Sequence, residues 1–460
     1  MSPVPRGPQP EPARPAGRGL LRDRDFGLLW AGETVSAIGT AITQVALPLA
    51  AVVELHAGAF RVSLLTAAVW VPWLLIGLPA GAWVDRLPRR PVMLTCDLAA
   101  LLALASTPVA AAAGVLTYAQ LLAVAVLVGA CAVFFQTAYQ VYLPGFVAEA
   151  QLAEANARLQ GSQSAAQIAG PALAGLLTQA VGAVTGLAAD AVSYGVSALG
   201  LALIRRRETA PPPVQRAGLR REIGQGLRFL LADPYLRVFT GYGALSNLAL
   251  TGYQSILIVF LIRTVGVTPG TVGGLLSGMS AGGLLGAATA TRLARRIGTA
   301  RAAIAANLAA GPFALLIPLA TRGPRLALVV IGGLGVGAAV VAGNVIRTSF
   351  RQAYTPRQLL GRVTVAMQFL NYGTIPAGAV LAGSLAAAAG PRTAEWAMTL
   401  TFALAPLLLF IGPAKRHRDL PAHPAPSHVP AGHPPAPHRY SATLTVSAPG
   451  LHAGEGADGR

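Results

Sequence analysis

We single out three carboxylic acids inside long apolar stretches of this sequence, Glu33, Asp97 and Asp190. In hydrocarbon a charged side chain costs about 2.5–3.5 kcal/mol on insertion scales, so such acids face a bundle interior or water. Glu33 is our first candidate for proton coupling, because loss of water favours the protonated carboxyl. Its alternative role is a carboxyl near the membrane surface that bonds to neighbouring helices. We expect Asp97 near the inner surface and Asp190 near the outer one, where a structural role competes with proton coupling.

Further polar residues in the same stretches are candidates for lining a central cavity. Each could instead form a bond between helices, typically about 0.6–2 kcal/mol. Because the set holds few charges, it favours a bulky amphipathic solute over a small ion or a sugar. The candidates are Gln44, Gln136, Gln140, Asn247, Gln254, Asn344, Arg347, Gln368 and Asn371.

The apolar stretches that carry these residues indicate an all-α integral membrane protein. The chain is 54% hydrophobic and 11% charged, whereas soluble domains carry about 25% charged residues. A spanning helix needs about 20 apolar residues, and lipid-exposed backbone must be helical or form a closed barrel. The short alternating segments of a barrel are absent. We predict twelve spans at 26–53, 62–83, 91–113, 117–138, 160–182, 184–204, 236–262, 269–291, 300–321, 325–346, 361–389 and 393–413.

The basic residues predict the orientation of these spans. The net charge of +18 could suggest nucleic-acid binding, but the basic residues lie between the spans and in the tails. With the N-terminus inside, the external loops hold only five of the 35 Lys and Arg residues, which fits the positive-inside rule. We therefore expect both termini in the cytoplasm and no nucleic-acid partner. The five external residues are Arg61, Arg263, Arg322, Arg325 and Arg392.

The longest gap between spans divides the chain into two six-helix bundles, at 26–204 and 236–413. Residues 205–235 form a cytoplasmic linker with an amphipathic, interfacial helix, because Leu219, Ile223, Leu227 and Leu230 recur at helical spacing. We expect disordered cytoplasmic tails at 1–25 and 414–460. Most histidines lie in the second tail; its prolines favour disorder over a metal site. Cys96 and Cys131 sit in spans as small buried hydrophobes.

Two pairs of segments indicate an internal repeat. Arg86-Leu87-Pro88-Arg89-Arg90 after the second span resembles Arg292-Leu293-Ala294-Arg295-Arg296 after the eighth, 206 positions later. A small-residue stretch beginning at Gly170 resembles one beginning at Gly378, 208 positions later. Two six-helix halves related by a parallel repeat are a transporter architecture.

The loop from Gly81 to Arg90 carries a more specific signal. It resembles the Gly-x-x-x-Asp-Arg-x-x-Arg-Arg signature of the major facilitator superfamily, with Gly81, Asp85, Arg86, Arg89 and Arg90 at the matching positions. Gly81 would permit close helix approach, and the arginines would hold the loop at the cytoplasmic surface. An ordinary basic loop would explain the arginines but not the acid.

The resemblance implies that Asp85 acts as a conformational latch against the start of the eleventh span. Its expected partners are the amides of that helix and Arg362. The second loop has Thr291 at the position of the acid, which leaves a latch there in doubt.

The fifth span resembles the antiporter motif of the same superfamily at Gly170, Pro171 and Gly175. The motif implies export, although plain small-residue packing explains it as well. Longer segments between about residues 20 and 413 resemble the branch that holds enterobactin and macrolide exporters. One departure is that the fourth span, Tyr118 to Ala138, lacks the arginine that such antiporters often carry.

The sequence thus predicts a major facilitator fold and a proton-coupled exporter of a drug-like or natural-product molecule in a bacterial cell membrane. An importer or facilitator of the same fold is the alternative, and a membrane sensor or enzyme is a third. No grouped catalytic residues, metal ligands or phosphate loop were found, so we expect no enzyme activity, cofactor or metal. We expect a monomer whose partners are a small-molecule substrate, protons and the lipid bilayer.

Overall fold

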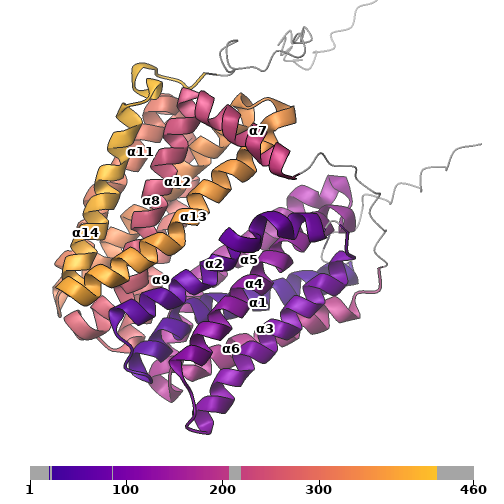
Figure 1. The fold of residues 1–460 in the computed structure, drawn as a ribbon, viewed down its shortest axis with the longest axis vertical. Helices are drawn as coiled ribbons and strands as arrows, with labels where there is room; N and C mark the ends of the chain where they lie inside the picture. The colour runs from indigo at the N-terminus through magenta and orange to yellow at the C-terminus, as the bar shows by residue number, and fades with distance from the viewer. Residues whose placement is uncertain (1–19, 21–22, 85, 207–218, 422–460) are drawn as a thin grey trace, which may run out of the picture. The chain divides into compact units, whose positions relative to one another are not determined.

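A computed structural model describes residue 20 and residues 23–84, 86–206 and 219–421 of the chain. The described residues of the first half form six long helices that pack together (Figure 1). Long apolar runs without strand-like alternation dictate helices, because each backbone group is then satisfied inside its own segment. These helices are α1 (Arg24–Val53), α2 (Ala59–Val84), α3 (Arg89–Ala112), α4 (Tyr118–Phe146), α5 (Leu152–Val181) and α6 (Val184–Leu203), with the short η2 (Glu149–Gln151) before α5.

The second half supplies another six spans, preceded by the amphipathic helix α7 (Leu219–Ala232). Phe229 and Leu230 of α7 are buried in one apolar cluster with Val363 of α13. The linker helix therefore packs on protein, with its buried side toward α13. The spans are α8 (Pro234–Val259) with η3 (Phe260–Val265), α9 (Pro269–Ser280) with α10 (Gly282–Ile297), α11 (Thr299–Ala314) with η4 (Ile317–Leu319), η5 (Pro324–Leu326) with α12 (Ala327–Tyr354), α13 (Arg357–Ala389), and α14 (Pro391–Leu404) with η6 (Ala405–Phe410) and η7 (Pro413–Arg416).

The predicted twelve-span architecture is confirmed, with one instructive difference at the fifth span. Eleven of the described helices are long and apolar enough to cross a membrane, and α5 is the long helix outside that set. Its first half carries polar residues and begins at Leu152, eight positions before the predicted start. Hydropathy misses this part, because a helix that lines a cavity can be polar on one side.

Two seams join the six-helix groups, and both involve the end of the bundle opposite α7, here named the far end. The first seam is formed by α5 and α9. A Cβ added to Gly175 would lie 2.6 Å from the Pro269 carbonyl oxygen and 2.8 Å from the Gly273 Cα. The Ala172 amide donates a hydrogen bond of 2.9 Å to the Ser277 hydroxyl across the same seam. Backbones at this separation require glycine on both helices.

The second seam is formed by α2 and α13, which lie side by side (Figure 1). A Cβ added to Gly383 would lie 2.8 Å from the Ser63 Cβ. Nearer the middle of the helices, the Tyr372 ring lies 5.8 Å from the Trp70 ring and 6.2 Å from the Trp73 ring, centre to centre. Beyond this aromatic group, Trp83 of α2 is 49% exposed. These contacts of the seam thus run from the far end to the middle of the two helices.

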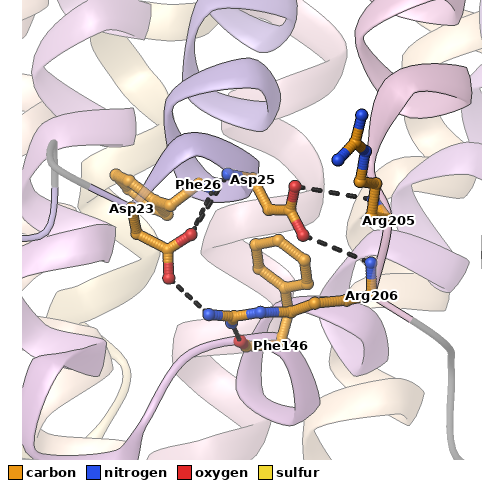
Figure 2. Close-up of polar contacts among 6 residues, drawn as sticks. All are labelled: Asp23, Asp25, Phe26, Phe146, Arg205 and Arg206. Atoms are coloured by element: carbon orange, nitrogen blue, oxygen red, sulfur yellow. Dashed lines mark hydrogen bonds and ion pairs between the residues drawn. The ribbon is translucent and has the colours of Figure 1, made fainter.

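At the other end, here named the linker end, a cluster of charged residues ties the linker to the first group (Figure 2). Asp23 caps α1 by accepting hydrogen bonds from the Asp25 and Phe26 amides. Its second carboxylate oxygen pairs with the Arg206 guanidinium. Arg206 also donates to the Phe146 carbonyl at 2.6 Å and stacks over the Phe146 ring at 5.0 Å. One side chain thereby connects the start of α1, the end of α4 and the chain that leaves α6.

Asp25 completes this cluster through backbone contacts. Its carboxylate accepts hydrogen bonds from the Arg206 amide at 3.2 Å and the Arg205 amide at 3.5 Å. In Figure 2 no dashed line joins the Arg205 side chain to either carboxylate. The two adjacent arginines therefore differ in role, since only the Arg206 side chain takes part in the cluster as drawn.

This difference predicts the effect of substitution at the two arginines. Arg206→Gln removes the ion pair and the ring contact, which are partly exposed, so we expect a loss of about 1–2 kcal/mol in stability. The thermal unfolding temperature of the purified protein should fall by a few degrees. Arg205→Gln is the matched control and should leave it nearly unchanged. Equal effects of the two variants would contradict the assignment.

The α5–α9 seam predicts opposite outcomes for two neighbouring glycines. Gly273→Ala places a Cβ against backbone atoms of α5 and should destabilise the fold by about 1–3 kcal/mol through overpacking. A Cβ at Gly274 meets no heavy atom within 4 Å, so Gly274→Ala should be neutral or slightly stabilising. Thermal unfolding of both variants in one detergent measures the difference. A Gly273→Ala protein as stable as Gly274→Ala would show that the backbones are not in contact.

Candidate functional site

A cavity of about 290 Å³ lies within the first group of helices. Residues of α1, α3, α4, α5 and α6 line it. It reaches from the first turns of α5, at the linker end, to the second half of α1. The polar lining residues are Glu33, Thr34, Ser36, Thr40, Gln44, Cys96, Asp97, Cys131, Gln136, Tyr139, Asn156, Gln160, Ser162, Gln163, Gln167 and Tyr194.

Two of the three predicted acids, Glu33 and Asp97, line this cavity together. One oxygen of each carboxyl is buried and has no hydrogen-bond partner among the described residues. The lining residues include no arginine, lysine or histidine. A buried carboxylate oxygen without a partner is costly, so a proton or a cationic ligand would stabilise this arrangement. Asp97, for which a structural role competes with proton coupling, thus lines the same cavity as Glu33.

Aromatic and apolar side chains form the other part of the wall. Phe135 and Tyr139 of α4 stack with their ring centres 6.2 Å apart, and Leu159 and Tyr194 lie on α5 and α6. Ligand sites commonly combine such apolar walls with a few polar groups that fix orientation. The cavity is therefore suited to a solute that has both an apolar body and a positive charge.

The third predicted acid, Asp190 of α6, lies outside this cavity. Its side chain is fully buried, and one carboxylate oxygen accepts a hydrogen bond of 2.9 Å from the Ser193 hydroxyl. A Cβ added to Gly39 of α1 would lie 2.6 Å from the Ser193 Cβ. Asp190 thus sits at a close approach of α1 and α6, and its second carboxylate oxygen is buried without a hydrogen-bond partner among the described residues.

The nine polar candidates are divided between the two groups of helices. Gln44 and Gln136 line the cavity, whereas Gln140 is an exposed residue of α4 outside it. The candidates of the second group do not line it. Gln254, Asn344 and Gln368 are exposed, and the Asn247 side chain donates to the Asn371 carbonyl at 3.4 Å, which joins α8 to α13.

Arg347, the remaining candidate, belongs to a network between three helices of the second group. Its guanidinium bonds to Asn344, donates to the Asn307 side chain at 3.3 Å and stacks over the Tyr242 ring at 4.7 Å. The Tyr242 hydroxyl donates to the same Asn307 oxygen at 2.7 Å. The network fixes α12 against α8 and α11, which is the helix-bonding alternative for this residue.

The latch loop is described only in part, because Asp85 lies outside the described residues. A Cβ at Gly81 would meet no heavy atom within 4 Å, so the expected close helix approach is not present there. Arg86 is exposed, and Arg90 donates hydrogen bonds of 2.8 Å to the last carbonyls of α6. Arg89 is buried at the start of α3.

Arg362, the expected partner of the latch, lies near the start of α13. It donates a hydrogen bond of 2.6 Å to the Gln225 side chain of α7. A Cβ added to Gly226 would lie 2.7 Å from the Arg362 backbone carbon. The linker helix is thereby held against the first turns of α13.

The antiporter-like motif lies on both sides of α5. A Cβ added to Gly170 would lie 3.0 Å from the Ala41 backbone of α1, inside the first group. Gly175 faces the other group, and the Pro171 carbonyl also borders Gly273. The motif residues therefore perform small-residue packing, Gly170 inside the first group and Pro171 and Gly175 at the seam between the two groups.

Two sets of residues escaped the sequence analysis. The first is the polar face of α5, Asn156, Gln160, Gln163 and Gln167, which line the cavity. Their spacings of four, three and four place them on one helical face. This periodicity was a usable signal in the sequence.

The second omission is Glu395 of α14, which is fully buried, with neither carboxyl oxygen hydrogen-bonded among the described residues. It follows Asp190 by 205 positions, close to the offset of the internal repeat. The repeat therefore could have identified it. Because an unpaired carboxylate is costly in such surroundings, the site suits the neutral acid.

Comparison with known proteins identifies the family. Residues 18–440 match the family described as transmembrane secretion effector. The chain is 31% identical over 414 residues to the multidrug efflux pump Tap of Mycolicibacterium fortuitum, covering 86% of this chain and 97% of the pump. It is 27% identical over 277 residues to macrolide efflux protein A of Streptococcus pyogenes, covering 55% and 66%.

Solved transporters share the fold. The nucleoside transporter NupG superposes with a TM-score of 0.70 at 12% identity, covering 84% of this chain and 99% of that one. A bacterial homologue of ferroportin gives 0.68 in its inward-facing state and 0.55 in its outward-facing state, both at 17% identity, with 86% and 84% of this chain covered and 99% and 98% of the homologue.

The predicted fold and the predicted efflux branch are thereby confirmed, and the chain is a transporter and not an enzyme. The chain belongs to the transmembrane secretion effector family, within the major facilitator superfamily.

Proposed function

We propose that this transporter exports bulky amphipathic cations in exchange for protons. The observation that carries the proposal is the cavity between α1, α3, α4, α5 and α6, which combines two carboxyls with aromatic walls and has no basic lining residue. An ammonium or similar cation can pair with a carboxylate that would otherwise be buried without a partner. The names of the relatives, a multidrug efflux pump and a macrolide efflux protein, support export.

Alternating access explains the position of the seams. The two groups touch through Gly175 and Gly273 and through Ser63 and Gly383 toward the far end, while the cavity extends to the linker end. We infer that the structure has the cavity open toward the linker end. The better superposition on the inward-facing homologue than on its outward-facing state supports this.

The distribution of basic residues supports a cytoplasmic linker end, from which the cavity would take its substrate inside a bacterial cell. Arg205 and Arg206 follow α6, and Arg295 and Arg296 end α10 at the same end. Both termini then lie in the cytoplasm. The protein would work as a monomer, because one chain supplies both halves of the translocation path.

Proton coupling would use Glu33, with Asp97 as its neighbour in the cavity. In the proposed cycle, a cation binding from the linker end displaces the proton from Glu33. Opening of the far end releases the cation, and a proton from outside returns to Glu33. The pair stands in for the fourth-span arginine of related antiporters, since α4 contains no charged residue.

The role of Glu33 predicts a loss of proton-driven transport. Glu33→Gln keeps the size of the side chain but cannot ionise, so cation uptake into everted vesicles should fall at least about tenfold, the effect expected from losing one charge-assisted contact. Uptake by this variant should also no longer depend on the pH gradient. Glu154→Gln, an acid on α5 paired with Arg158 outside the cavity, is the control. If the Glu33→Gln protein retained proton coupling, a residue other than Glu33 would have to carry the proton.

The proposed latch predicts a defect at Asp85 that does not affect insertion. Asp85→Asn removes the charge that would engage the start of α13, so efflux should fall while the amount of protein in the membrane stays the same. Thr291→Asn places the same side chain at the matching position of the internal repeat, which lies within α10, and should transport normally. Normal efflux from Asp85→Asn would refute the latch.

A further inference from the structure

A second cavity, of about 540 Å³, lies at the far end and is unrelated to the acidic one. Both groups of helices contribute to it, namely the first turn of α2, the end of α8 with η3, the end of α13 and the start of α14. It therefore borders the second seam, next to Ser63 and Gly383. The lining residues are Gly58, Ala59, Phe60, Arg61, Val259, Arg263, Thr264, Ala386, Ala387 and Pro391.

Two arginines, one from each group, determine the charge of this cavity. The lining residues include no aspartate or glutamate. Arg61 stacks over the Tyr118 ring at 5.6 Å, and the Tyr118 hydroxyl donates to the Arg61 carbonyl at 2.8 Å, which orients this turn. Arg263 donates to the Ala57 carbonyl at 2.8 Å. Each guanidinium has five N–H donors, so both retain donors for a ligand.

The helix ends around the cavity do not alter its positive charge. α2 and α14 begin at the cavity, whereas η3 and α13 end there. Each helix terminus carries about half an elementary charge, positive at the start and negative at the end. Two starts and two ends largely cancel, which leaves the two guanidinium charges.

The remaining wall is mostly apolar. Phe60 is 39% exposed, and Val259 and the alanines of α13 complete the wall. An occupant with a singly charged anionic group and an apolar body would match both parts. Guanidinium pairs preferentially with phosphate and carboxylate.

We propose that this cavity binds the phosphate headgroup of an anionic phospholipid from the outer leaflet and that the bound lipid holds the far end closed. The phosphate would contact Arg61 of one group and Arg263 of the other. Since α2 and α13 must separate for the far end to open, a ligand that bridges both groups favours the state with that end closed. The choice of leaflet rests on the orientation in the proposed function, whereas lipid binding itself does not.

The first test measures lipid retention by the purified protein with native mass spectrometry, without any substrate. Phosphatidylglycerol should be retained in preference to phosphatidylcholine. The double variant Arg61→Gln/Arg263→Gln should lower its apparent affinity about tenfold or more, as expected for the loss of charge-assisted contacts. Arg325→Gln is the control, because Arg325 is an exposed arginine at the same end and does not line this cavity.

A second arm separates a lipid from a free anion. Millimolar inorganic phosphate should not displace phosphatidylglycerol; efficient displacement would show that the site takes phosphate alone and would overturn the lipid assignment. Equal retention of both lipids, or an equal loss in the Arg325→Gln protein, would also overturn it. Because no transport is measured, failure here leaves the exporter proposal intact, and failure of export leaves this result unchanged.

Discussion

The contact of α5 with α9 is the constraint on which the rest of the arrangement depends. Helices in lipid gain little from apolar burial against each other and associate through close packing of small residues. Gly175 and Gly273 allow the two backbones to touch, and the Ala172–Ser277 hydrogen bond crosses the same place. The second half of α5 therefore packs in the seam. The other half carries its polar face into the acidic cavity.

The chemistry of the two halves is correspondingly unequal. The first group encloses Glu33 and Asp97 with aromatic side chains. The second group places Arg347 in a bonded network with Asn307 and Tyr242, where its charge is stabilised by packing and hydrogen bonds. Substrate recognition is therefore attributed to the first group. The second group, in this account, provides the moving partner across the seams.

Much of the fold could be predicted from the sequence, because apolar runs in lipid have helices as their main solution. The start of α5 at Leu152 could not be found by hydropathy, since Asn156 and Gln160 make this segment polar. Glu33 was predicted as a functional acid because its charge is costly in its span. The grouping of Asp97 with Glu33 could not be predicted, because span positions do not reveal which faces of α1 and α3 meet. The same limit applies to Arg347, whose partner Asn307 is 40 residues away.

The central claim is that a cation and a proton compete for the carboxyls of one cavity. The most direct measurement is proton release when tetraphenylphosphonium is added to purified protein in weakly buffered detergent solution. Wild-type protein should release protons as the cation binds, and Glu33→Gln should release far fewer. Binding without proton release in the wild type, or equal release from both proteins, would contradict the account.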